Sequence, residues 1–199
     1  MNSRTLLPRN RRGRNYEKVA LRIRDFAGVG LEHPLDPFAL ADYAKIAVVR
    51  PTDLQALSPA VLRELTGRSR SSWSAVTMDL GDGSQLCIIN PTHTAERTRA
   101  TLMEEIVHVV LGHRPTRIFM GAGGLPCREY NAVNEEVAYG VGAAALVPYV
   151  ALFLGLTDGA TPATLATKYR VSEQLVSYRI KITMLWPLYK SKMAAAAGS

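Results

Sequence analysis

The chain of 199 residues contains little of what marks secreted or membrane-spanning proteins. It has two cysteines, Cys87 and Cys127, which are too few to predict a disulfide framework. The longest apolar run, VGAAALVPYVALFLGL, is interrupted by Pro148 and rich in small residues, so no membrane-spanning helix is expected. The first residues are polar and rich in arginine, without the apolar segment of a secretory signal. We therefore expect a cytoplasmic protein without a membrane anchor.

Acidic residues are absent from the first fourteen positions, where five of the arginines lie. These arginines account for most of the formal net charge of +7, so the rest of the chain is only slightly basic. Residues 1–14 are expected to form a basic, flexible arm. Such an arm can contact nucleic acid or stay solvated. No aromatic or glycine pattern accompanies the arginines, which favours the solvated alternative.

Local patterns predict helices on either side of a small sheet. The segment NYEKVALRIRDFAGVG has Val19, Ile23 and Phe26 at helical spacing, which predicts one buried face. The run IAVVR is typical of a strand, and SPAVLRELTG predicts a helix with Ser58 as its N-cap and Gly67 as its end. The runs SWSAVTMDL and QLCIIN flank GDGS, as in a β-hairpin. This order predicts an α+β fold with a small antiparallel sheet packed on helices.

The helix expected over about residues 97–112 contains the sequence TLMEEIVHVVLGH. Glu104 and His108 are four residues apart, so they project from the same face, and Glu105 lies beside them. Two ligands and a general base have this arrangement in the His-Glu-x-x-His pattern of zinc proteases, but here a glutamate replaces the first histidine. Carboxylate oxygen is a competent zinc ligand. The alternative is an ordinary amphipathic helix, because such a triplet is common by chance.

A third ligand is expected from the segment NEEVAYGVGAAALVP, which opens with Glu135 and Glu136. The glycines and alanines that follow allow this segment to pack closely on the preceding helix. Such packing would bring one of the two carboxylates to Glu104 and His108.

Together these blocks resemble the ImmA/IrrE family of zinc-dependent metallopeptidases, over most of residues 15–185. The family's core reads approximately Arg-x-apolar-Thr-Leu-x-His-Glu-x-x-His, and this chain has RTRATLMEEIVH. Its later block resembles EEVAYGVGAAALVP, and registering on Ala138, Leu146 and Pro148 makes Glu135 the third ligand. The resemblance implies a zincin-like peptidase domain with Glu104, His108 and Glu135 as metal ligands and Glu105 as the catalytic base.

Glu104 is the departure from the family pattern. A site with two glutamates and one histidine is less positive than one with two histidines and one glutamate, which weakens the metal as a Lewis acid. Oxygen-rich coordination also favours harder ions. We expect a divalent cation, with zinc favoured and manganese or iron as alternatives.

By resemblance, the chain is expected to be a metal-dependent endopeptidase that cleaves a regulatory protein, such as a helix-turn-helix repressor. An edge strand, SAVTMDL or QLCII, would hold the substrate in an extended conformation. Tyr130, His113 and Arg128 are candidates for stabilising the oxyanion only because they lie near the motifs. The alternative is a non-catalytic regulator that keeps the fold and binds a protein or DNA.

The expected organisation is an arm over residues 1–14, a peptidase domain over 15–157, a helical segment over 158–190 and a tail over 191–199. The segment LATKYRVSEQLVSYRI resembles a helix-turn-helix, whose second helix would read DNA. The favoured alternative is that its apolar residues pack on the peptidase domain. Those residues are Leu165, Val171, Leu175, Val176 and Ile180.

Overall fold

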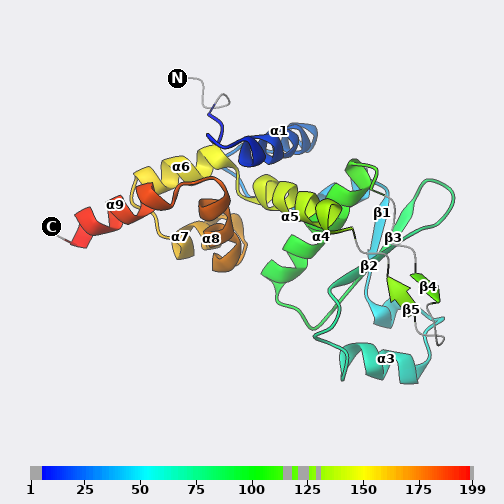
Figure 1. Cartoon of the computed structure of the whole chain (residues 1–199). Helices are drawn as coiled ribbons and strands as arrows, with labels where there is room; N and C mark the ends of the chain where they lie inside the picture. The colour runs from blue at the N-terminus through cyan, green and yellow to red at the C-terminus, as the bar shows by residue number, and fades with distance from the viewer. Residues whose placement is uncertain (1–5, 114–117, 121–125, 129–130, 198–199) are drawn as a thin grey trace.

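The computed structural model describes residues 6–113, 118–120, 126–128 and 131–197 (Figure 1). The first half of the chain contains α1 (Arg11–Phe26), α2 (Pro37–Tyr43), β1 (Ile46–Val49), η2 (Pro51–Asp53), α3 (Pro59–Thr66), β2 (Ala75–Asp79) and β3 (Gln85–Ile89). The second half contains α4 (Ala95–Val110), β4 (Ile118–Met120), β5 (Pro126–Arg128), α5 (Ala132–Leu146), α6 (Tyr149–Thr157), α7 (Pro162–Tyr169), α8 (Glu173–Ile182) and α9 (Trp186–Ala197).

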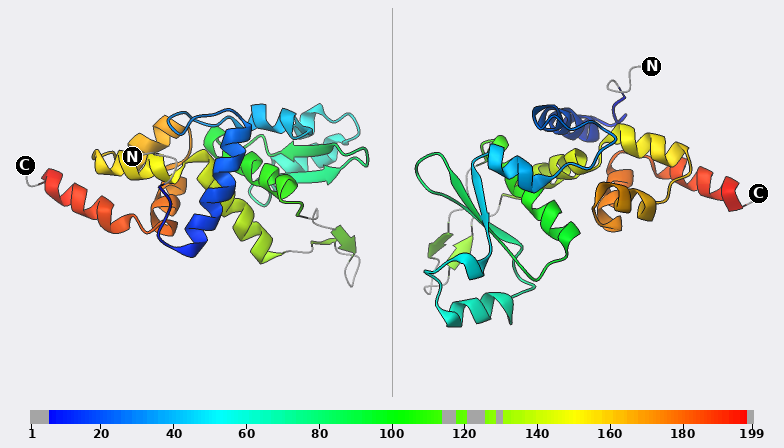
Figure 2. Two further views of the ribbon diagram at one scale, coloured as in Figure 1. Left: turned by 90° about the horizontal axis from the view of Figure 1, so that it is seen from above. Right: turned by 180° about the vertical axis from the view of Figure 1, so that it is seen from behind.

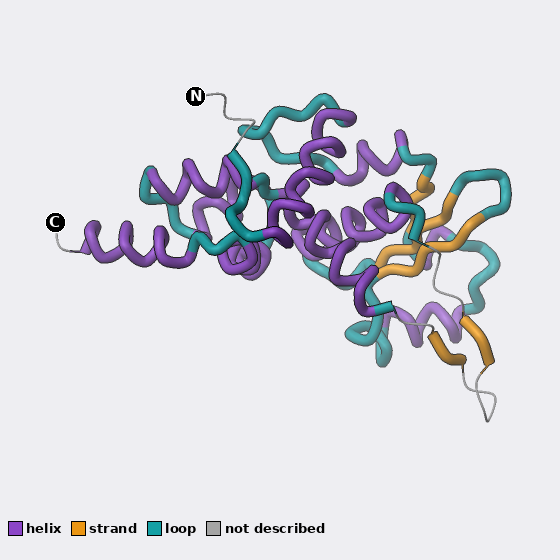
Figure 3. Tube along the Cα trace, turned by 45° about the horizontal axis from the view of Figure 1, so that its top comes forward, coloured by secondary structure: helices purple, strands orange, loops and turns teal. Residues whose placement is uncertain are grey.

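Strands and helices are segregated, as the predicted α+β class requires. The strands lie at one end of the molecule, α6 to α9 lie at the other, and α4 and α5 lie between them (Figure 1, Figure 3). Helix α5 packs against both α4 and α1, while α4 also contacts β2 and β3 (Figure 2). The long helices therefore connect the small sheet to the helical end, and the α+β prediction is confirmed.

The main sheet has the strand order β1-β3-β2. Strands β2 and β3 form the predicted antiparallel hairpin, and Gly81 and Gly83 take positive φ angles in its turn. Strand β1 joins the other side of β3 in parallel, so the sheet is mixed. The connection through α3 and β2 is long enough for the chain to return in the same direction. QLCII is therefore the central strand, and the suggestion that it forms a substrate-binding edge is wrong, whereas β2 lies at an edge.

Cys87 lies at the centre of this sheet and is fully buried. Burial raises the pKa of its thiol to about 11, and the nearby charge of Glu105 contributes in the same direction. Cys87 is a packing residue, as the alternation of β3 predicts.

Helix α1 begins inside the stretch that the sequence assigns to the basic arm. The Asn10 side chain accepts a hydrogen bond from Gly13 N at 2.7 Å and donates one to Ile182 O at 2.6 Å. This cap joins the start of α1 to the end of α8, so residues 11–14 are helical. The end of α1 also differs from the prediction, because Phe26 is 69% exposed while Ile23 is buried.

Two charged side chains without solvent exposure hold the helices together. Glu17 of α1 and Arg179 of α8 form an ion pair of 2.6 Å. Glu17 also accepts a hydrogen bond from Tyr149 N at 2.6 Å, and Arg179 donates one to Val147 O at 3.0 Å. The pair therefore ties α1 and α8 to the bend between α5 and α6.

Helices α7 and α8 begin after the N-caps Thr161 and Ser172, whose side chains accept hydrogen bonds from Thr164 N and Leu175 N. Their apolar face belongs to the same core as α1, α4 and α5, through Leu165, Val171, Leu175, Val176 and Ile180. On α8, the buried Arg179 is paired with Glu17, and the exposed basic residue of this helix is Lys181. The following helix, α9, runs through the segment predicted as a tail.

Within the described residues, no single helix is long and apolar enough to cross a membrane; the bent pair α5 and α6 meets the criteria of length and composition only when combined.

Candidate metal centre

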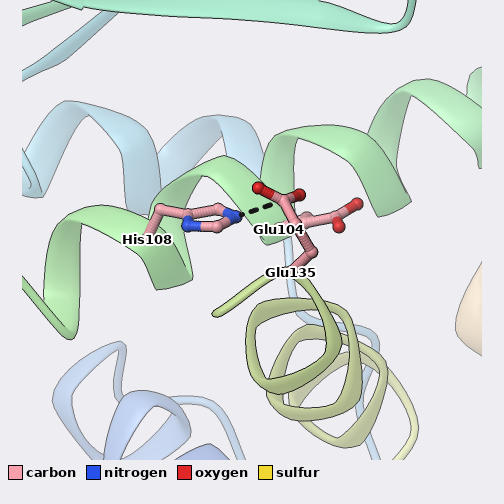
Figure 4. A group of neighbouring side chains, drawn as sticks. All are labelled: Glu104, His108 and Glu135. Carbon is pink, nitrogen blue, oxygen red and sulfur yellow. Dashed lines mark ion pairs between the residues drawn. The ribbon is translucent and has the colours of Figure 1, made fainter. Parts of the chain in front are cut away.

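Helix α4 supplies two of the three clustered side chains. Thr94 caps its first turn by accepting a hydrogen bond from Arg97 N at 3.3 Å. One helical turn separates Glu104 from His108, and both project toward α5 (Figure 4). Gly142 of α5 approaches this stretch closely, since a Cβ added to it would lie 3.5 Å from Glu104 N. Helices α4 and α5 are therefore in contact along this stretch, which brings their polar residues near each other.

Helix α5 brings Glu135 to this face from its first turn. Asn131 caps the helix and accepts hydrogen bonds from Val133 N and Asn134 N. His108 Nε2 lies 3.7 Å from Glu135 Oε2, and one ligand atom from each of Glu104, His108 and Glu135 lies within 4.8 Å of the others (Figure 4). The three side chains are partly buried. The predicted convergence is therefore observed.

Glu136 faces a different helix from its neighbour Glu135. Its carboxylate forms an ion pair with Arg12 and accepts a hydrogen bond from Tyr16 Oη at 3.2 Å. The Tyr16 ring lies against Gly140, where an added Cβ would overlap it. Helix α1 thereby holds Glu136 away from the cluster, which distinguishes the two adjacent glutamates.

Glu105 lies beside the cluster on the side of α4 toward the sheet. At 100° per residue, its position is about 60° around the helix axis from that of His108. Its charge contributes to the raised pKa of Cys87 in β3, after the larger effect of burial. Glu105 as a residue is partly exposed to solvent.

Tyr139 and His113 lie close enough to the cluster for the charges of its members to act on them. Burial raises the pKa of Tyr139, and the charge of Glu104 adds to that shift. Burial lowers the pKa of His113, His108 lowers it further, and Glu135 opposes the shift. The sequence did not single out Tyr139, although its position one turn after Glu135 was a usable signal.

Of the three residues suggested for stabilising the oxyanion, the structure describes the side chain of His113 alone. His113 contacts His108, with 3.1 Å between their Nδ1 atoms. Arg128 belongs to β5, but its side chain lies outside the described part of the structure. The whole of Tyr130 also lies outside the described residues.

The clustered side chains fit a divalent cation by chemistry and spacing. Two carboxylates and one imidazole form a ligand set found at zinc sites and acceptable to manganese or iron. In a tetrahedral zinc site, ligand atoms about 2.0–2.2 Å from the ion lie about 3.3–3.6 Å from one another. The observed spread of up to 4.8 Å therefore requires the side chains to close in by about 1 Å around the ion.

Comparison with known proteins agrees with this geometry. No curated protein matches the chain. A family profile described as an IrrE N-terminal-like domain matches residues 66–181, which include both helices of the cluster. Because the match covers more than half of the sequence, this chain belongs to that metallopeptidase family, Peptidase_M78.

Proposed function

We propose that this protein is a metal-dependent endopeptidase in which Glu104, His108 and Glu135 hold the cation. The observation that carries the proposal is the convergence of their ligand atoms within 4.8 Å at the contact of α4 and α5. Family membership supports a protein substrate. The burial of apolar residues from α7 and α8 in the common core favours a structural role for residues 158–190 over DNA reading.

Peptide hydrolysis would use the side chains in distinct roles. A bound divalent cation supplies Lewis acidity for attack on a peptide carbonyl. Glu105 accepts a proton from the attacking water and transfers it to the leaving amine. Glu104, His108 and Glu135 keep their positions because two packed helices carry them. Tight placement matters, since misplacement of about 1 Å can reduce a rate about 100-fold.

The identity of the metal would follow from the charge of these ligands. Two carboxylates neutralise a divalent cation, whereas a single carboxylate leaves one positive charge. Replacement of the family's first histidine by Glu104 should therefore narrow the preference for zinc over manganese or ferrous iron. In Glu104→His, we expect tighter zinc binding and weaker manganese binding than in the wild-type protein.

The substrate would be an extended segment of a regulatory protein, such as a helix-turn-helix repressor. Strand β2 supports this proposal because it lies at the edge of the sheet and α4 packs against it. Val76 and Met78 are 41% and 40% exposed, so apolar side chains of a substrate have surfaces to contact. Backbone hydrogen bonds along β2 would give affinity with little dependence on sequence.

Metal analysis and proteolysis of a denatured protein test the two parts of the proposal. The wild-type protein should bind one metal ion, and Glu135→Ala should lose it. Glu136→Ala is the matched control, because the adjacent carboxylate faces Arg12 and Tyr16. Glu105→Gln should retain metal while proteolysis falls by a factor of about 10²–10⁴.

Each adverse result has a definite meaning. If the wild-type protein binds no metal at any stoichiometry, the proposed enzymatic function is wrong and the non-catalytic regulator is favoured. Equal metal loss in Glu135→Ala and Glu136→Ala would contradict the assigned ligands. Salt-sensitive DNA binding by the metal-free protein would support the regulator's DNA-binding form.

A further inference from the structure

The end of α4 returns the chain toward the metal centre. Gly112 takes a φ of 64°, in the left-handed region, and an added Cβ would meet nothing within 4 Å. His113 N donates to His108 O at 2.9 Å, and Gly112 N donates to Val109 O at 3.0 Å. Glycine is therefore required here for its backbone conformation, because this reversal ends the helix and brings residue 113 back over the last turn.

The reversal places two imidazoles in direct contact. The Nδ1 atoms of His108 and His113 are 3.1 Å apart, and the ring centroids are 5.0 Å apart with an interplanar angle of 69°. A hydrogen bond between two ring nitrogens needs one N–H group and one lone pair. The contact therefore couples the tautomer of His108 to that of His113.

The other nitrogen of His108 faces Glu135. Its distance of 3.7 Å from Glu135 Oε2 is longer than a hydrogen bond. A proton on Nε2 would also occupy the lone pair that a cation needs. Both points favour a proton on Nδ1, directed toward His113.

We infer that His113 is a positioning residue, which accepts a hydrogen bond from His108 Nδ1 and thereby presents the Nε2 lone pair to the cation. This inference rests on the proposed metal site. Histidine ligands in metalloproteins commonly donate their second N–H group to a carboxylate, a carbonyl or a water molecule. Here the acceptor is a neutral imidazole, which orients the ring without adding a third negative charge to Glu104 and Glu135.

The test compares His113→Phe, which cannot accept, with His113→Asn, whose side-chain oxygen takes the place of Nδ1. Zinc dissociation constants are measured by chelator competition at about pH 8, where an ordinary imidazole with a pKa of about 6.5 is neutral. We expect His113→Phe to weaken zinc binding about 10–100-fold and His113→Asn to restore most of it. The matched control is His33→Phe at an exposed histidine, which should leave zinc affinity unchanged.

A spectroscopic measurement separates orientation from general loss of structure. In ¹⁵N NMR of the zinc-loaded wild-type protein, the Nδ1 atoms of His108 and His113 should show coupling through the hydrogen bond, with the proton on His108. Unchanged zinc affinity in His113→Phe, or a proton on His113 Nδ1 instead, would overturn this inference and leave the metal site intact. A wild-type protein that binds no zinc, manganese or iron would overturn the metal site and this inference with it.

Discussion

Two clusters of charged groups lie at opposite ends of α5, and they differ in burial and in the balance of acidic and basic groups. At the carboxyl end, Glu17 and Arg179 are fully buried and neutralise each other at 2.6 Å. At the amino end, Glu135 joins Glu104 and His108, which brings two carboxylates and one imidazole together in a partly buried site. One carboxylate and one guanidinium suit a structural ion pair, whereas two carboxylates and one imidazole suit a cation site.

The comparison assigns a separate task to each end of the helix. Arg179 and Glu17 also bond the backbone at Val147 and Tyr149, so they hold the carboxyl end of α5 at the α6 bend. With that end held, the packing of α5 against α4 places the first turn of α5, which carries Glu135, beside α4. The buried pair therefore contributes, through the placement of α5, to bringing Glu135 close to Glu104 and His108.

Breaking the structural cluster should have the largest effect on stability. Arg179→Met leaves the carboxylate of Glu17 buried without its counterion, which typically costs about 3–5 kcal/mol. The free energy of unfolding, measured by urea denaturation, should fall by that amount. The control is Lys181→Met on the exposed face of the same helix, with an expected change within about 0.5 kcal/mol. Equal effects of the two substitutions would remove the distinction between the buried pair and the surface.

Two glycines of α5 should respond in opposite directions to substitution by alanine. In Gly140→Ala the new methyl group overlaps the Tyr16 ring, and such overpacking typically costs about 1–3 kcal/mol. In Gly142→Ala the methyl group makes ordinary contacts of 3.5 Å, so the higher helix propensity of alanine should contribute up to about 1 kcal/mol. Urea denaturation of both variants measures these changes. A larger loss in Gly142→Ala would show that the α4 contact, and not the α1 contact, limits the packing of α5.

The smallest stability effect is expected in the metal-free state of Glu135→Gln. The side chain is partly exposed at the start of a helix, so its loss should change the free energy of unfolding by less than about 1 kcal/mol. Zinc at about 100 times its dissociation constant should stabilise the wild-type protein by about 2.7 kcal/mol. Thermal unfolding with and without zinc should show that stabilisation in the wild-type protein and its loss in the variant. An equal zinc-induced shift in both proteins would show that Glu135 is not a ligand.

Local parts of the fold were predictable because they depend on neighbouring residues. Ser58 caps the helix that follows it, as predicted, and the GDGS turn forms the expected hairpin. The separation of Glu104 and His108 by four residues determines their common face on α4. The parallel addition of β1 was not visible, because strand pairing depends on a partner far along the sequence.

The amino-acid sequence by itself determined the helical spacing of Glu104 and His108, the presence of two adjacent glutamates on a helix rich in small residues, and the resemblance that selected Glu135. Only the tertiary structure decided that Glu136 faces α1, that Glu17 and Arg179 pair, and that His113 returns to His108. The first group follows from the order of residues along single helices, together with the backbone geometry that sets which side chains share a face. The second depends on the docking of separate helices and on one left-handed glycine, which bring together groups whose contact the sequence pattern did not reveal.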